Sequence, residues 1–285
     1  MRSASPGRPT VQAPTSAPKA PLPNYTLPDL KKRVWIARPK LSATLPPEFN
    51  GVDVSGILMA RFLEIFNHEK SPFVAEIAPG DLPEDPAEGA RLARGAGFAG
   101  LLVPTLGSLE VTRRRAPEGL LQSSTVDLSV RVSSELIDGG SGKVLGTADE
   151  TDASSQTRSE LLSTEALPEP ARRLEESARK LAIRTLGRYL PWAEKLGWSG
   201  KVVRLDGARV YIDSGRRTGL QVGDTLRVVE APREIYDPQT GVFVGVAPGR
   251  LKATLKIIQL FGQDGAMSAL QSGGGILLGD RVELY

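Results

Sequence analysis

The carboxyl-terminal third of the chain alternates short runs of branched apolar residues with turns rich in glycine and aspartate. Glycine accepts positive φ angles and aspartate bonds to its own turn backbone, so runs between such turns indicate short strands with tight connections. The pattern predicts a small SH3-like β-barrel over residues 198–285, with Gly215, Gly223 and Gly241 at positive φ. The expected strands contain residues 202–203, 210–212, 226–229, 242–244, 255–258, 276–278 and 282–284.

The preceding part of the chain mixes helical and strand periodicity. Asp85 stands before Pro86 as a helix N-cap, and the glycine-rich turn at 139–142 joins two strands into a hairpin. The order β-α-β-α-β-β-β-α predicts an α+β protein, with an α/β sandwich over residues 33–195 ahead of the barrel. The expected helices cover residues 52–68, 86–95 and 169–195, the last kinked or ended near Pro191, and the expected strands cover residues 34–39, 73–77, 101–112, 125–138 and 143–148.

Residues 1–32 form a segment of proline, alanine, serine and threonine that is predicted to be a flexible tether, because it has too little apolar surface to offset its ordering entropy. Much of the basic excess lies there. Residues 1–33 hold six bases and one acid, which leaves 30 bases and 32 acids in the rest of a chain with net charge +3. A nearly neutral folded body disfavours nucleic acid as a partner.

Cysteine is absent, which removes disulfides and thiolate chemistry. No run of about 18 apolar residues occurs, so no transmembrane segment is expected. The chain opens with Met-Arg-Ser-Ala-Ser-Pro and not with an apolar signal region. Two locations stay open at this point: the cytoplasm if Met1 is native, or the periplasm if a signal peptide preceded this sequence.

Two glycine-rich strings resemble nucleotide-binding motifs. Residues 95–100 match GxGxxG, but a helix precedes and a strand follows, which reverses the order that dinucleotide binding requires. Residues 139–143 resemble a phosphate loop, but Val144 stands where a magnesium-binding hydroxyl belongs. Both are interpreted as turns, and no cofactor is predicted.

The titratable residues show no catalytic or metal-binding arrangement. The single histidine, His68, lies at a helix end without His or Cys companions. The acids Asp149, Glu150 and Asp152 lack the spacing of a calcium loop and are interpreted as turn decoration. Without a nucleophile, a base and an orienting group together, the chain is predicted not to be an enzyme, with no catalytic and no metal-binding residues.

Long exposed arginines and tyrosine at strand ends and loop tips are candidate docking residues, since these types anchor many interfaces. Basic residues at strand ends also protect sheet edges, so a solvated role is the alternative for the arginine triplet. The candidates are Arg216, Arg217 and Tyr236 in the barrel, and Arg113, Arg114 and Arg115 in the first domain.

Several segments carry resemblances to known families. Residues 34–39, 102–110 and 136–145 resemble strands and a hairpin of the curli-secretion lipoprotein, penicillin-binding-protein-activator and TolB amino-terminal-like families. Residues 200–203, 210–215, 219–224 and 235–241 are similar to the carboxyl-terminal barrel of the flagellar assembly protein T family, a barrel that also occurs in pilus-secretin-associated proteins. Together these resemblances span residues 33–285.

The resemblance implies a non-enzymatic assembly component of a periplasmic, outer-membrane-associated machine, with protein partners and a homo-oligomeric ring; a flagellar motor ring is the preferred setting. The alternatives are a pilus- or secretin-associated protein, and a regulatory module that contacts a cell-wall synthase or peptidoglycan. The chain departs from the curli pore, because residues 112–123 and 149–167 are short and polar where that family has membrane hairpins. Pore formation is therefore not expected, and a lipid anchor is not expected within this sequence because it has no cysteine to accept a lipid.

Overall fold

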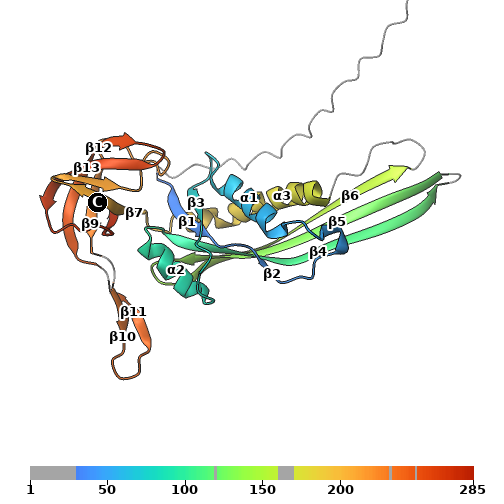
Figure 1. Ribbon diagram of the computed structural model, residues 1–285, viewed down its shortest axis with the longest axis horizontal. Coiled ribbons are helices and arrows are strands. Elements are labelled where there is room, and N and C mark those ends of the chain that lie inside the picture. The colour runs from blue at the N-terminus through green and yellow to red at the C-terminus, as the bar shows by residue number, and fades with distance from the viewer. Residues whose placement is uncertain (1–29, 119–120, 160–169, 231–232, 248) are drawn as a thin grey trace, which may run out of the picture.

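The computed structural model describes residues 30–118, 121–159, 170–230, 233–247 and 249–285. It contains a sheet flanked by helices, followed by a closed six-stranded barrel (Figure 1). The mixed α+β class and the closed barrel are confirmed. Among the described helices, none is long and apolar enough to cross a membrane.

The sheet of the first unit has the strand order β3-β1-β4-β5-β6, and the short β2 pairs with β4. Its β3-β1-β4 part is parallel and its β4-β5-β6 part is antiparallel. The last three strands are much longer than the expected 101–112, 125–138 and 143–148. The strands are β1 (Lys32–Ile36), β2 (Lys40–Leu41), β3 (Phe73–Ile77), β4 (Gly100–Glu118), β5 (Leu121–Asp138) and β6 (Val144–Ser159).

Helices α1 (Val54–Phe66) and α3 (Pro170–Ala193) share one apolar core with the sheet, and α2 (Pro86–Gly95) shares another. Side chains alternate across a strand, so Val34 and Ile36 of β1 face the first core while Trp35 faces the second. The two cores therefore lie on opposite faces of the sheet. A 3-10 turn, Pro47–Phe49, precedes α1. The predicted cap is confirmed, because the Asp85 carboxylate accepts a hydrogen bond from the Ala87 amide at 2.9 Å.

The two nucleotide-like strings are turns, as expected. Helix α2 ends at Gly95, Gly97 has φ +92°, and β4 begins at Gly100, so the helix does precede the strand. Gly142, with φ +68°, lies in the turn between β5 and β6. Both strings connect elements and neither opens a helix.

The barrel closes in the order β12-β13-β8-β7-β14-β9. The expected strand at 276–278 is wrong: this stretch is a loop with exposed Leu277 and Leu278. The barrel strand that the pattern misses is β13, which has few branched residues and is stabilised by pairing with both β12 and β8. The expected barrel strand at 242–244 is also misplaced, because it belongs to β11 (Phe243–Ala247), which pairs outside the barrel with β10 (Arg233–Tyr236), a strand that was not expected. The strands are β7 (Ser199–Asp206), β8 (Arg209–Ile212), β9 (Thr225–Val229), β12 (Leu251–Phe261), β13 (Gly265–Gly273) and β14 (Arg281–Leu284).

Of the three glycines expected at positive φ, Gly223 and Gly241 adopt it, at +103° and +69°. Gly215 does not, so that expectation is wrong. Its requirement for glycine is steric, because a Cβ there would lie 2.7 Å from the Gly265 carbonyl oxygen. The glycine at this position allows two backbone segments to approach each other closely.

The two units are joined by buried polar contacts. Arg33 of β1, itself buried, donates to Asp213 of the barrel at 2.6 Å and to Glu76 of β3 at 3.2 Å. The Lys31 amide donates to the Thr218 carbonyl at 3.0 Å, and Leu30 packs against the barrel core. Residues 30–32, which were assigned to the predicted tether, are therefore part of the fold, and the rest of the predicted tether lies outside the described residues.

Candidate functional site

The three longest strands continue past their pairing with β1 and β2 and form what we call the arm: residues 107–118 of β4, 121–132 of β5 and 150–159 of β6. Helix α3 covers the inner part of the arm, and its far end extends beyond the helices (Figure 1). Strand β6 is the last strand of the sheet, so its outer edge pairs with no described strand. The other edge belongs to β4, whose pairing with β1 and β2 stops at Leu106. Within the described part of the chain, the arm therefore has two open edges.

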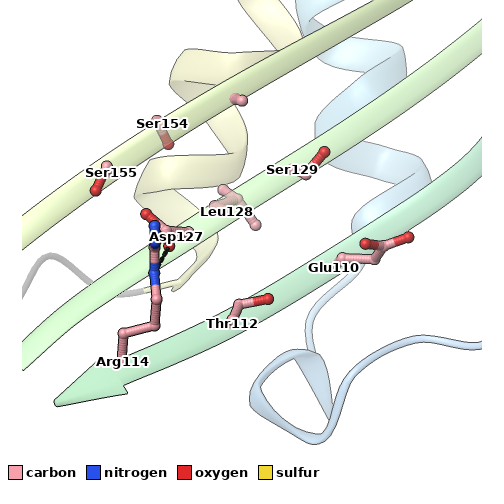
Figure 2. Close-up of a pocket in the computed structure, with 9 residues that line it drawn as sticks. Glu110, Thr112, Arg114, Asp127, Leu128, Ser129, Ser154 and Ser155 are labelled. Carbon is pink, nitrogen blue, oxygen red and sulfur yellow. Dashed lines mark hydrogen bonds and ion pairs between the residues drawn. The ribbon is translucent and has the colours of Figure 1, made fainter.

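The two faces of the arm differ in chemistry. Val126, Leu128 and Val130 of β5 are buried on the helix side. Alternation places small and polar side chains on the opposite face, where they border a shallow cavity of about 370 Å³ (Figure 2). Its lining residues include Glu110, Thr112, Arg114, Asp127, Ser129 and Ser155.

One ion pair crosses this cavity. Arg114 donates to Asp127 through Nε at 2.9 Å and through Nη2 at 2.5 Å (Figure 2). Hydrogen bonds from the Ser155 hydroxyl and from Arg114 hold the pKa of the half-buried Asp127 below its ordinary value. A neighbouring pair, Arg131 with Asp149, follows on the proximal side. The open face is thus polar and internally charge-paired, which suits a hydrated contact surface.

The helix side of β6 is held by a row of ion pairs with α3. Arg188 contacts Glu150 at 3.0 Å, and Asp152 contacts Arg184 at 3.1 Å and Lys180 at 3.6 Å. Four residues of helix rise about 6 Å and two residues of strand rise about 6.8 Å, so the two spacings match. The acids at 149–152 are strand residues, and their expectation as turn decoration is wrong.

The same helix also reaches the backbone of the edge strand. Arg184 Nη1 donates to the Thr151 carbonyl at 2.6 Å, and the buried Arg173 donates to the Ser154 carbonyl at 3.0 Å. The sequence contained a signal for this arrangement, namely the spacing of four between residues 180, 184 and 188. That signal is meaningful only when a strand with acids at every second position is recognised beside it.

The predicted docking arginines of the first domain lie on β4. Arg113 is exposed and contacts Glu48 at 3.2 Å, while Arg114 makes the ion pair with Asp127 already described. Arg115 is aligned with Ser124 of β5. The triplet is therefore part of the arm, and two of its guanidinium groups have partners within the chain.

The predicted docking residues of the barrel lie in two places. Arg216 and Arg217 are exposed on the loop after β8, where Arg217 Nη2 donates to Asn67 of the first unit at 3.1 Å. Tyr236 ends β10 (Arg233–Tyr236), which pairs with β11 (Phe243–Ala247) in a hairpin that projects from the barrel (Figure 1). Tyr236 is exposed there, together with Ile235, Val242 and Val244. The hairpin is a second exposed surface, more apolar than the arm.

Other chemistry is sparse in the described residues. No group of three or more His, Asp or Glu side chains among them is placed to hold a metal ion. The His68 Nδ1 accepts a hydrogen bond from the Lys70 amide at 3.2 Å and serves the loop after α1.

Comparison with known proteins finds only solved structures of low similarity. No family model matches the chain, and no curated protein matches it. Solved structures include a DUF330 protein from Xanthomonas campestris, at 12% identity and a TM-score of 0.38 over 61% of this chain and 92% of that one. A putative neuraminyllactose-binding hemagglutinin homologue from Helicobacter pylori has 13% identity and a TM-score of 0.37, over 60% of this chain and 91% of that one. The structure of a PelC dodecamer from Paraburkholderia phytofirmans has 17% identity and a TM-score of 0.31, over 57% of this chain and 93% of that one. These scores are too low to support an inference about this chain.

Proposed function

We propose that the protein is a non-enzymatic assembly component of a periplasmic, outer-membrane-associated machine, in which copies associate through the edges of the arm into a ring. The observation that carries this is the three-stranded arm, in which the outer edges of β4 and β6 pair with no other described strand. An open strand edge presents unpaired amides and carbonyls, which another strand can satisfy. The sequence resemblance to the flagellar assembly protein T family supports a flagellar motor ring as the setting.

Strand direction decides which assembly the arm favours. Strands β4 and β6 run in the same direction, because each is antiparallel to β5. Rotation about an axis along the strands therefore brings β6 of one copy beside β4 of the next in parallel pairing, a heterologous contact that can close into a ring. Pairing of β6 with β6 would be antiparallel and would stop at a dimer.

The arm's charges do not oppose the heterologous contact. The acids that face α3 on β6 are neutralised within the chain, so the strand adds little charge of its own to the edge. On β4, Arg113 is paired with Glu48 and Arg114 with Asp127. A β4 edge beside a β6 edge therefore brings no uncompensated like charges together.

The hairpin β10-β11 supplies a separate contact for a different protein of the machine. Its exposed Ile235, Tyr236 and Val244 lie outside the barrel core, and apolar side chains on a projecting hairpin mark a docking element. This division gives one surface to copies of the chain and another to a partner.

Cross-linking between two single-cysteine variants tests the ring contact, and the chain's lack of cysteine makes the labelling clean. Thr112→Cys lies on β4 and Ala153→Cys on β6, both exposed. Each variant is treated alone with a bismaleimide, and the two are then mixed. We expect a covalent dimer only in the mixture, while the control Arg209→Cys on the barrel gives none with either.

Three results would contradict the proposal. A product from Ala153→Cys alone would indicate edge pairing in a closed dimer. Absence of product from the mixture, with sedimentation showing only monomer at high concentration, would remove the arm as an assembly surface. Retention of such a monomer on peptidoglycan or on a cell-wall synthase would favour the regulatory module instead.

A further inference from the structure

The seam between α2 and the barrel contains a cavity of about 290 Å³ whose lining is dominated by arginine. It lies far along the molecule from the arm, at the end where α2 approaches the barrel (Figure 1). Its barrel wall includes residues of β9 and β14. Its walls come from both units. The lining residues are Arg94, Arg227, Val229, Glu230, Gly249, Leu251, Arg281 and Glu283.

The arginines of this seam are incompletely paired. Glu283 is shared, since it accepts from Arg227 at 2.8 and 3.0 Å and contacts Arg281 at 2.8 Å. Arg94 has no ion-pair or hydrogen-bond partner among the described residues. The Nε groups of Arg94 and Arg281 are both buried and have no acceptor there. A buried guanidinium N–H without an acceptor costs free energy, and this cavity brings two such arginines together.

The electrostatics agree with this interpretation. Burial, followed by the nearby positive charge of Arg94, lowers the pKa of Arg281 to about 10. The carboxylates of Glu283 and Asp138 oppose this shift without cancelling it. Three arginines face two glutamates in the lining, so the cavity keeps a positive excess.

A purely structural role for Arg94 does not account for its position. Arg94 lies in the last turn of α2, where a cation complements the helix dipole without leaving water. Its guanidinium instead lies so close to the backbone of Gly140 that a Cβ at that position would collide with Nη1. The glycine of the β5-β6 turn thus leaves room for Arg94 beside the seam.

We propose that this seam cavity binds a phosphate-type oxyanion, held between Arg94 of the first unit and Arg281 and Arg227 of the barrel. Guanidinium forks match the spacing of phosphate oxygens, and the ligand would accept hydrogen bonds from the arginine side chains that line the cavity. One water molecule takes up about 30 Å³ in the liquid, so a cavity of about 290 Å³ has room for a phosphate group, which is several times larger than a water. The ligand bridges two units and therefore tightens their junction. This inference does not depend on the arm or on ring formation.

Binding is measured on the full chain by calorimetry and by thermal unfolding, with sodium phosphate against sodium chloride at equal ionic strength. We expect a saturable rise in Tm with phosphate. Arg94→Gln should weaken the apparent Kd about ten-fold, the effect of losing one charged contact of about 1.4 kcal/mol. Arg94→Lys keeps the charge but loses the fork and should be intermediate. Arg209→Gln, an exposed arginine elsewhere in the barrel, is the matched control and should bind like the parent.

A second experiment identifies the source of the phosphate group. Vesicles of phosphatidylcholine with and without phosphatidic acid are sedimented with the parent and with Arg94→Gln. Binding that requires both phosphatidic acid and Arg94 assigns the site to a lipid headgroup, whereas a response to inorganic phosphate alone assigns it to a free anion. The site is refuted if neither probe binds saturably, or if binding of either is unchanged in Arg94→Gln that is folded by circular dichroism.

Discussion

Replacing Asp152 by alanine tests whether α3 fastens the edge strand β6. The Asp152 side chain is only 4% exposed and contacts two cations, Arg184 and Lys180, which are each 45% exposed. Removing one member of a fully buried ion pair costs about 3–5 kcal/mol. Here both cations can turn to water and the cost of burying the carboxylate disappears as well, so a loss of about 1–3 kcal/mol is expected.

Asp149→Ala is the matched control on the same strand. Asp149 is 50% exposed and pairs with an Arg131 side chain that is 56% exposed, so its loss should cost about 0–1 kcal/mol. Urea unfolding followed by circular dichroism gives both midpoints, and the double variant Asp152→Ala/Arg184→Ala gives the coupling between the partners. Equal midpoints for the two single variants, or no coupling in the cycle, would refute the argument that α3 holds the strand through this acid.

Two further predictions concern the barrel. Gly215→Val should cost about 1–3 kcal/mol and more than Gly197→Val, since a Cβ at 215 would collide with the Gly265 carbonyl whereas a Cβ at 197 meets nothing within 4 Å; a thermal melt in which Gly197→Val is the worse variant would contradict this. Burial raises the pKa of Asp264 above its ordinary 3.8 despite bonds from the Gly215, Thr218 and Arg217 amides, so the folded state holds its proton to higher pH than the unfolded state. The parent should lose stability as pH rises through this raised pKa, from about pH 4 upward, and Asp264→Asn should lack that loss; identical pH profiles of the urea midpoint would count against it.

Local signals predicted the elements that local chemistry determines. The Asp85 cap, the α2 bounds and the turn around Gly142 each follow from a few neighbouring residues, and each is present in the structure. The positive φ of Gly223 and Gly241 follows in the same way. These features require no knowledge of what lies across the sheet or barrel.

The errors occurred where distant segments decide the outcome. Strand β13 lacks a branched run and is held by β12 and β8 on its two sides, while the branched residues at 276–278 have no such neighbours and form a loop. Gly215 has an ordinary φ and is constrained by Gly265, fifty residues away in the chain. Pairing across the fold therefore overrides the local preference at these positions.

The acids of β6 show why the candidate site could not be located from sequence alone. Asp149, Glu150 and Asp152 follow one another closely, yet Glu150 and Asp152 face α3 while Asp149 lies on the exposed face with Arg131. A polar stretch was expected to be a loop, but α3 lies beside it and neutralises every second residue. Because the cations of α3 compensate the buried carboxylates of Glu150 and Asp152, β6 can continue along the sheet although it is too polar for an ordinary core. The edge of β6 that faces away from β5 pairs with no described strand. The same ion pairs that permit β6 to be long therefore also position the edge through which we propose that copies associate.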